Sequence, residues 1–145
     1  GMAYHYQTAH HGPARQADAF VHALRTADAL DWPVMIDVED EGLSERNLLA
    51  WLARFMSVAG KTPLIYTSAW KWSGLIGINR LWARDFPLHV AYWQFSQPPT
   101  LPDVWDKWVL WQVTSRWRME GHDGNLDLNL FHGGLADLVA FARQY

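Results

Sequence analysis

The sequence predicts an α/β domain built on a mostly parallel sheet. Apolar runs typical of buried strands alternate with segments of helical periodicity through the first two thirds of the chain, and strands then follow one another with little helix between them. Such alternation implies parallel strands joined by right-handed crossovers. The carboxyl ends of parallel strands meet on one rim of the sheet, which is where we expect a functional site.

Local signals set the bounds of the expected elements. Pro13 suits the first turn of a helix, Ser44 suits an N-cap, and Gly60 suits the end of a helix. Residues 97–102 are too rich in proline for regular structure and are expected to form a loop. In order, we expect a strand at 2–6, a helix at 13–29, a strand at 33–38, a helix from 44 to 60, a strand at 63–67, a short helix to 76, strands at 87–93 and 107–115, a short strand at 125–128 and a helix at 135–144.

The strand at 33–38 is the most informative stretch of the chain. It is an apolar run that delivers two carboxylates, Asp37 and Glu39, at its C-terminal end. Side chains alternate along a strand, so both carboxylates face the same way, with Cα atoms about 6–7 Å apart. Burial and mutual repulsion raise the pKa of at least one of them, which keeps a proton available for general acid catalysis. The alternative is a strand end whose acids face solvent or cap the next helix.

Composition argues against several classes of protein. With 145 residues the chain is expected to be one domain, 1–145, and its net charge of -3 argues against nucleic acid as a partner. No apolar run reaches the roughly 18 residues of a membrane helix, and no signal peptide is seen. There is no cysteine, so disulfides and thiol chemistry are excluded. For His5, His10 and His11 a solvated environment is favoured over a metal site, because no second kind of ligand accompanies them.

Tryptophan is unusually abundant, with ten residues in the chain. Flat indole rings stack on the apolar faces of sugars, and they also fill cores. Trp51 has helical spacing with Leu48 and Phe55 and is expected in the core. Trp93 and Trp111 stand beside polar residues at strand ends, and are the better candidates for sugar platforms.

Seven short pieces of the chain resemble, in the same order, motifs of glycoside hydrolase family 25, the lysozymes or N-acetylmuramidases. AYHY at 3–6 is similar to the family's G-x-Y-H-F, QADAF at 16–20 to Q-A-D-x-F, and DVED at 37–40 to the D-x-E strand. PLIYTS at 63–68, PLHVAYW at 87–93, WVLWQVTS at 108–115 and LDLN at 126–129 are similar to P-x-I-Y-T-S, P-L-W-V-A-x-W, W-x-x-W-Q-Y-T-S and V-D-L-N. The resemblance implies an α/β fold of the TIM-like barrel type, in which β/α units are followed by consecutive β-strands.

The resemblance also implies roles for the two carboxylates. Glu39 is the general acid that protonates the β-1,4 glycosidic oxygen between N-acetylmuramic acid and N-acetylglucosamine. Asp37 orients and polarises the 2-acetamido group of the substrate, or holds the charge of the transition state. The reaction needs no cofactor and no metal, and the stereochemical outcome stays open.

Six further residues are implied as substrate-binding positions, and four of them have a structural alternative. Tyr66, Trp93 and Gln112 line the sugar subsites, although Tyr66 could instead be packed against a backbone carbonyl. Asp127 matches a late active-site aspartate or is a turn residue. Tyr4 and Tyr6 border the groove or lie at an exposed sheet edge.

The chain departs from the family pattern at its start. A G-I-D-V-S strand, whose aspartate belongs to the carboxylate cluster, and a second β/α unit normally precede the Y-H-F strand. We therefore expect an incomplete, N-terminally truncated barrel, about 50 residues shorter than a complete one. Gly1 before Met2 resembles an expression-tag scar, which makes Met2 the expected natural start. Exposed sheet edges predict a homo-oligomer, with a missing partner chain as the alternative.

These expectations lead to two functional interpretations. The first is a lysozyme-like hydrolase that acts on peptidoglycan glycan strands, without nucleic-acid or membrane partners. It would stay in the cytoplasm until released by lysis. The second is a degenerate, non-catalytic relative that binds cell-wall glycan or assembles with a partner chain, and that remains in the cytoplasm.

Overall fold

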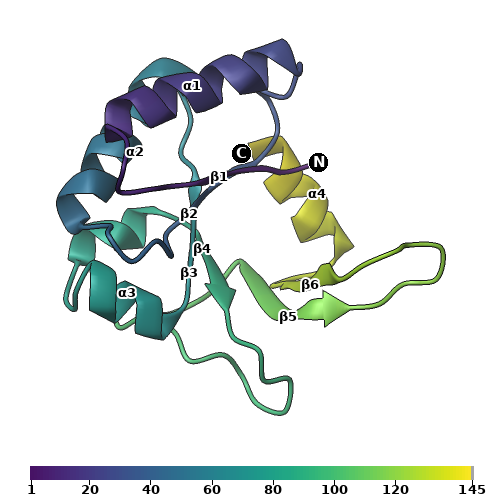
Figure 1. Cartoon of the computed structure of the whole chain (residues 1–145). Helices are drawn as coiled ribbons and strands as arrows, with labels where there is room; N and C mark the ends of the chain where they lie inside the picture. The colour runs from purple at the N-terminus through teal and green to yellow at the C-terminus, as the bar shows by residue number, and fades with distance from the viewer. Residues whose placement is uncertain (145) are drawn as a thin grey trace.

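One curled sheet organises the structure, a computed structural model that describes residues 1–144 (Figure 1). Its six strands lie in the order of the sequence. The strands are β1 (Ala3–Tyr6), β2 (Val34–Asp37), β3 (Leu64–Thr67), β4 (Leu88–Ala91), β5 (Leu110–Trp117) and β6 (Leu126–Phe131). The helices are α1 (Pro13–Thr26), α2 (Glu45–Ala59), α3 (Ala69–Leu75) and α4 (Leu135–Gln144), with a 3-10 helix, η1 (Leu81–Asp85), before β4.

Strand directions follow the predicted alternation. Neighbouring strands from β1 to β5 are parallel, and β6 runs antiparallel to β5. A helix after each of β1, β2 and β3 returns the chain to the other end of the sheet, which makes the next strand parallel. No ladder joins β1 to β6 within residues 1–144, so the sheet curls without closing (Figure 1). The predicted α/β fold, an incomplete TIM-like barrel ending in consecutive strands, is confirmed.

Helix α2 illustrates how local signals define an element. The Ser44 hydroxyl accepts a hydrogen bond from the backbone N–H of Asn47 and so satisfies one free donor of the first turn. Gly60 ends the helix with a φ of 70°, in the left-handed region that favours glycine. Both ends therefore lie where the sequence predicts them.

Other bounds differ from the predicted ones. Helix α1 ends at Thr26 rather than near Ala29, because Asp28 adopts a φ of 51° that breaks the helical backbone. Strand β4 is shorter than predicted, β5 begins and ends later, and β6 extends to Phe131. The extension of β6 follows from its antiparallel ladder with β5. Helix η1 was not predicted.

Apolar clusters lie on both faces of the sheet. The larger cluster lies under α1, α2 and α3, and contains the fully buried Trp51, Phe55 and Trp72. Trp51 stacks on Phe55 with ring centroids 4.9 Å apart, which confirms its predicted place in the core. Because side chains alternate along β2, Val38 points into this cluster and Asp37 points to the opposite, inner face.

The inner face holds a smaller apolar cluster below the site. Phe141 of α4 packs against this cluster, so α4 lies on the other side of the sheet from α1 and α2 (Figure 1). The buried members of the cluster are Met35, Leu64, Tyr66, Ala91 and Leu110. No helix in residues 1–144 has the length and apolar character needed to cross a membrane.

Trp111 corrects one expectation. Its side chain belongs to the larger cluster, is 7% exposed, and donates from Nε1 to the carbonyl oxygen of Tyr92 at 2.6 Å. A ring buried in this way offers no free face to a sugar. The next residue along β5, Gln112, points to the inner face instead, because successive side chains alternate.

Candidate active site

The register of the sheet brings several predicted site residues to one rim. Asp37, the last residue of β2, pairs with Tyr6 of β1 on one side and with Tyr66 of β3 on the other. Next to them, Ala91, the last residue of β4, pairs with Gln112 in the first half of β5. These positions lie on the rim formed by the carboxyl ends of β1 to β4, which is the predicted location of the site.

Asp37 is a buried carboxylate with an unoccupied hydrogen-bonding atom. The residue is 9% exposed, and its Oδ1 has no hydrogen-bond partner among the described residues. Burial, followed by the charge of Glu39, raises the pKa of Asp37 to about 7. An unpartnered carboxylate oxygen in the interior is costly to the fold, and protonation of the carboxyl lowers that cost.

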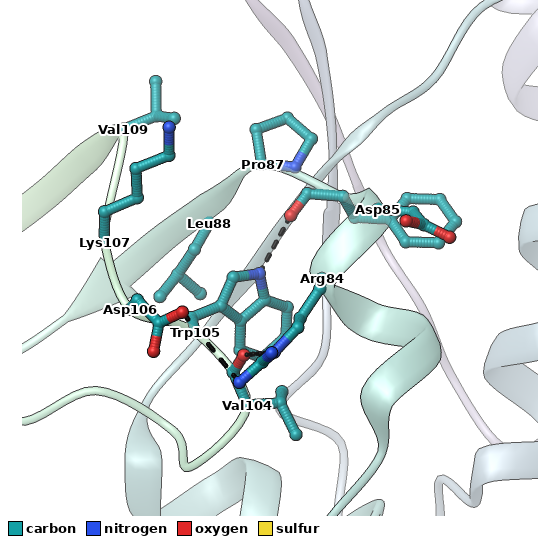
Figure 2. A pocket seen from close by; sticks show the side chains of 10 residues that line it. Arg84, Asp85, Pro87, Leu88, Val104, Trp105, Asp106, Lys107 and Val109 are labelled. Carbon is teal, nitrogen blue, oxygen red and sulfur yellow. Dashed lines mark hydrogen bonds and ion pairs between the residues drawn. The ribbon is translucent and has the colours of Figure 1, made fainter.

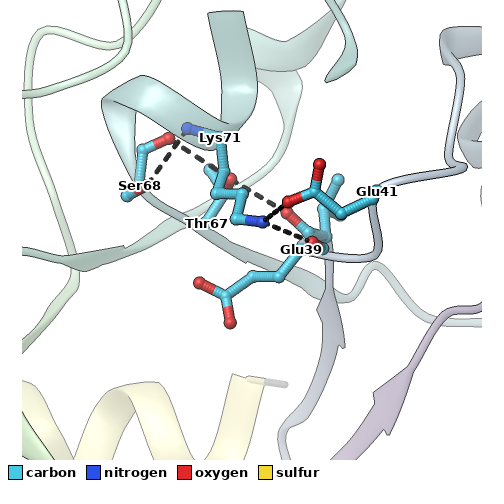
Figure 3. Close-up of polar contacts among 6 residues, drawn as sticks. Glu39, Glu41, Thr67, Ser68 and Lys71 are labelled. Carbon is cyan, nitrogen blue, oxygen red and sulfur yellow. Dashed lines mark hydrogen bonds and ion pairs between the residues drawn. The ribbon is translucent and has the colours of Figure 1, made fainter. Parts of the chain in front are cut away.

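Glu39 lies in the loop after β2, where two contacts fix the backbone. Lys71 of α3 donates from Nζ to the carbonyl oxygen of Glu39 at 3.0 Å and to Oε1 of Glu41 at 2.7 Å, while the Glu39 carboxylate points away from them (Figure 3). The backbone N–H of Ala9 donates to Oδ2 of Asp40 at 2.7 Å, which fixes the same loop from the other side. Burial raises the pKa of Glu39, and the positive charge of Lys71 opposes that rise.

Tyr66, Gln112 and Trp93 form a hydrogen-bonded group beside the carboxylates. The Tyr66 hydroxyl donates to Oε1 of Gln112 at 2.8 Å, and Nε1 of Trp93 donates to the same oxygen at 2.9 Å. The alternative in which Tyr66 bonds a backbone carbonyl is therefore wrong. Burial raises the pKa of Tyr66. The ring of His89 lies edge-on to Tyr66, and burial lowers the pKa of His89 to about 4. Both groups are thus neutral at neutral pH.

A cavity of about 440 Å³ opens next to these groups. Two tryptophans on it are largely exposed, Trp93 at 63% and Trp70 at 71%. Trp93 was predicted as a sugar platform, whereas Trp70 and Lys71 were not predicted as site residues. The signal that could have found them is Ser68, which directly follows β3 and caps α3, so that the first turn of α3 stands on the rim. The lining comprises Glu39, Ser68, Trp70, Lys71, Ala91, Tyr92, Trp93 and Gln94.

The remaining predicted residues lie at the borders of the site. Tyr4 is 63% exposed on the edge strand β1 and pairs with Met35, two positions before Asp37. Tyr6 is closer, since the charges of Asp40, Asp37 and Glu39 add to burial in raising its pKa. Tyr4 therefore matches the alternative of an exposed sheet edge, whereas Tyr6 lies nearer to the carboxylates.

Asp127 lies on β6 rather than in a turn, which corrects the turn alternative. It is exposed, and its charge contributes to the raised pKa of Tyr66, so it faces the same rim. His5, one of the histidines considered for a metal, stacks on Trp51 and hydrogen-bonds Gln16, so the expected solvated environment is wrong for this residue. Within the described part of the chain, no three His, Asp or Glu residues are arranged to hold a metal ion.

A second cavity, of about 510 Å³, lies at the opposite end of the strands, between η1 and the loop before β5 (Figure 2). The Trp105 indole fills its floor and donates to the carbonyl oxygen of Phe86, and Arg84 reaches the carbonyl oxygen of Val104 and the carboxylate of Asp106. The guanidinium of Arg84 in this cavity is thus already bonded to groups of the protein. The cavity near Glu39 remains the one lined by a carboxylate of the predicted pair, with exposed indoles beside it.

Replacing Gln112 by Leu tests the hydrogen-bonded group. The substitution removes the acceptor shared by Tyr66 and Trp93 and leaves a buried hydroxyl without a partner, so the free energy of unfolding should fall by about 1–3 kcal/mol. Urea unfolding followed by tryptophan fluorescence measures the change. Gln97→Leu, at an exposed loop position, is the control and should stay within about 0.5 kcal/mol of the parent. Equal losses in the two variants would contradict the assigned role.

Comparison with known proteins agrees with this geometry. The pattern of "Glycosyl hydrolases family 25" matches residues 2–122. An N,O-diacetylmuramidase from Arthroderma benhamiae is 32% identical over 127 residues, which cover 80% of this chain and 52% of that protein. Lysozyme M1 from Streptomyces globisporus is 32% identical over 123 residues, covering 77% of this chain and 42% of that protein. This chain therefore spans about half the length of the curated relatives that it matches.

The fold agrees as well. The crystal structure of a lysozyme from Streptomyces coelicolor superposes with a TM-score of 0.80 at 27% identity, over 98% of this chain and 71% of that one. A muramidase structure from Acremonium alcalophilum superposes with a TM-score of 0.74 at 25% identity, over 97% of this chain and 71% of that one. With its matched pattern, its relatives and its incomplete barrel, the chain belongs to glycosyl hydrolase family 25.

Proposed function

We propose that this chain is a muramidase domain that cleaves the β-1,4 bond between N-acetylmuramic acid and N-acetylglucosamine in peptidoglycan, with Glu39 as the general acid. The observation that carries the proposal is the carboxylate pair on the rim. Asp37 and Glu39 project from one strand end, both have raised pKa values, and Glu39 lines a cavity flanked by exposed indoles. Related proteins named as lysozymes and N,O-diacetylmuramidases support the choice of substrate.

The raised pKa of Asp37 gives the carboxylate pair a way to place its proton. Without substrate, burial favours a proton on Asp37, whose pKa is about 7. An acetamido N–H that donates to the Asp37 carboxyl would stabilise its carboxylate form and lower its pKa. The proton shared by the pair is then held by Glu39, which is the position that acid catalysis requires.

Bond cleavage follows from that arrangement. The bond between C1 of N-acetylmuramic acid and the bridging oxygen breaks, and the oxygen keeps the electron pair and takes the proton of Glu39. Asp37, now a carboxylate, holds the acetamido group and the positive charge that develops on the sugar. Water then adds at C1, and Glu39 takes a proton back from it.

Exposed aromatic residues would bind the glycan strand on either side of the carboxylates. The rings of Trp70 and Trp93 offer flat apolar faces, and Nε1 of Trp93 is held by Gln112, which fixes the plane of that ring. Asp127 and Tyr6 would border the same groove. The domain would meet this substrate at the cell wall, after release from the cytoplasm by lysis.

The test is release of soluble muropeptides from purified peptidoglycan sacculi. The proposal predicts that fragments accumulate with time and with protein concentration. Sedimentation of the protein with the sacculi is measured in parallel. Binding without any release, by folded protein, would contradict the proposal and would support the non-catalytic interpretation.

We also propose that the chain forms a homo-oligomer through its open sheet edges. Strand β1 pairs only with β2 and β6 only with β5 among the described residues, and unpaired strand edges associate readily. Apolar side chains of α4 nearby are exposed, among them Leu135, Leu138 and Val139. Such a surface is unfavourable in a monomer.

Light scattering on a size-exclusion column tests this assembly. The backbone N–H of Ala3 donates to the carbonyl oxygen of Pro33, directly before β2, so the N–H of Tyr4 points to the free edge, since successive groups alternate. Tyr4→Pro removes that donor and should lower the measured mass from a dimer to a monomer, because proline is tolerated on edge strands but cannot donate. A monomeric parent protein at tens of micromolar would contradict the proposal.

A further inference from the structure

Lys71 contacts the candidate general acid through the backbone rather than through the carboxylate. Its Nζ donates to the carbonyl oxygen of Glu39 at 3.0 Å and to Oε1 of Glu41 at 2.7 Å (Figure 3). The Lys71 side chain is 20% exposed, and the Glu41 side chain is 82% exposed. Nζ also lies 5.0 Å from the ring centroid of Trp70, so the indole covers one side of the ammonium group.

The position of Lys71 is set by the start of α3. The hydroxyl of Ser68 accepts a hydrogen bond from the backbone N–H of Lys71 at 3.1 Å, which fixes the first turn directly after β3. Thr67, the last residue of β3, donates to the carbonyl oxygen of Val38 at 3.1 Å. Side-chain bonds therefore tie the loop that carries Glu39 to β3 and α3, and Lys71 provides the bond to Glu39 itself.

Lys71 is the cationic group that acts on Glu39 among the described residues, and its charge opposes the effect of burial on the pKa of Glu39. The groups that interact with Glu39 directly are Asp37, Tyr6, Tyr66 and Lys71, and those that act on these neighbours are Glu41, Asp40 and Asp127.

We propose that Lys71 is a positioning residue for Glu39, and that Glu41 moderates it. Lys71 holds the Glu39 backbone in place through its bond to the carbonyl oxygen. Its positive charge also favours the carboxylate form of Glu39, and Glu41 neutralises part of that charge. The proposal rests on the assigned role of Glu39 as general acid. It goes beyond that role by naming the pair that adjusts the pH range over which the acid works.

Two substitutions should move the same property in opposite directions. Lys71→Met removes a positive charge near Glu39, so the pKa of Glu39 should rise. The basic limb of the pH–rate profile should then shift to higher pH by about 0.5 pH unit or more. Glu41→Gln removes the partner that neutralises Lys71, so the pKa of Glu39 should fall and the limb should move down. Lys71→Arg keeps both the charge and the donor and should restore the parent profile.

The direct measurement is an NMR titration of the Glu39 carboxyl carbon in the parent, Lys71→Met and Glu41→Gln proteins. It needs no turnover, so it separates this proposal from the muramidase proposal: an inactive parent would count against the activity alone. The pH dependence of kcat/KM gives the second readout. A loss of stability alone would lower activity at every pH without moving the limb.

Lys61→Met is the matched control. Lys61 also donates from Nζ to backbone carbonyls, those of Leu30 and Trp32, but it lies at the opposite end of the sheet. It should leave the titration of Glu39 unchanged. Opposite shifts in Lys71→Met and Glu41→Gln support the proposal. An unchanged Glu39 titration in both variants, or shifts in the same direction, overturns it, and Glu41→Gln, at an exposed position, supplies that result even if Lys71→Met does not fold.

Discussion

Glu39→Gln is expected to reduce the rate of glycan cleavage by about 10²–10⁴-fold, the usual contribution of a positioned general acid. Glutamine matches glutamate in shape and keeps the backbone carbonyl that Lys71 holds, so the fold and the cavity should persist. The amide cannot protonate the bridging oxygen, so N-acetylglucosamine would have to leave as an unprotonated alkoxide, which is a poor leaving group. Initial rates of muropeptide release by the two proteins measure the effect.

The control for this substitution is Glu120→Gln, which makes the same chemical change in the exposed loop between β5 and β6. Its rate should equal that of the parent. Binding of Glu39→Gln to sacculi should also remain, because the aromatic residues are unchanged. A Glu39→Gln protein that cleaves within a few-fold of the parent rate would show that another group donates the proton.

Asp37→Asn is expected to lower activity by about 10²–10³-fold and to stabilise the folded protein at neutral pH. The folded-state pKa of Asp37, about 7, is above the unfolded value of 3.8. The folded state therefore binds the proton more tightly, and the stability from this group is complete in acid and is lost as the pH rises through about 7. Asparagine carries no charge, so the free energy of unfolding of Asp37→Asn relative to the parent should grow as the pH rises from 3.8 to about 7 and then level off.

Urea unfolding at several pH values measures this difference, with the exposed Asp123→Asn as the control. Comparing the two proteins at each pH matters because His89 contributes in the opposite sense. Its folded-state pKa of about 4 is below its usual value of 6.5, so stability from His89 is lost as the pH falls through that range. A stability difference for Asp37→Asn that does not change with pH would contradict the buried, proton-holding carboxylate.

Elements with local signals could be predicted from the sequence, and those that depend on distant contacts could not. Helix α2 was predicted because Ser44 and Gly60 mark its two ends. Helix η1 was missed because its support comes from elsewhere in the chain. The Trp82 indole donates to the carboxylate of Glu45 at 2.9 Å and its ring packs 5.9 Å from that of Trp72, and no local pattern announces those partners.

The site shows the same division. Asp37 and Glu39 could be placed near each other from the sequence because they are two positions apart at the end of one strand, which is a local property. Trp111 was misplaced because alternation does not say which face of a strand is covered, and its neighbour Gln112 took the inner face. Lys71 was missed because its role depends on a carbonyl contact with a residue 32 positions away in the sequence.

The identity of the new reducing end tests the central claim most directly. Products released from peptidoglycan by the parent protein are reduced with borohydride and analysed by mass spectrometry, with Glu39→Gln treated in the same way. The muramidase proposal predicts muropeptides that end in reduced N-acetylmuramic acid, and their absence from the Glu39→Gln sample. Products that end in reduced N-acetylglucosamine, or equal yields from the two proteins, would contradict it.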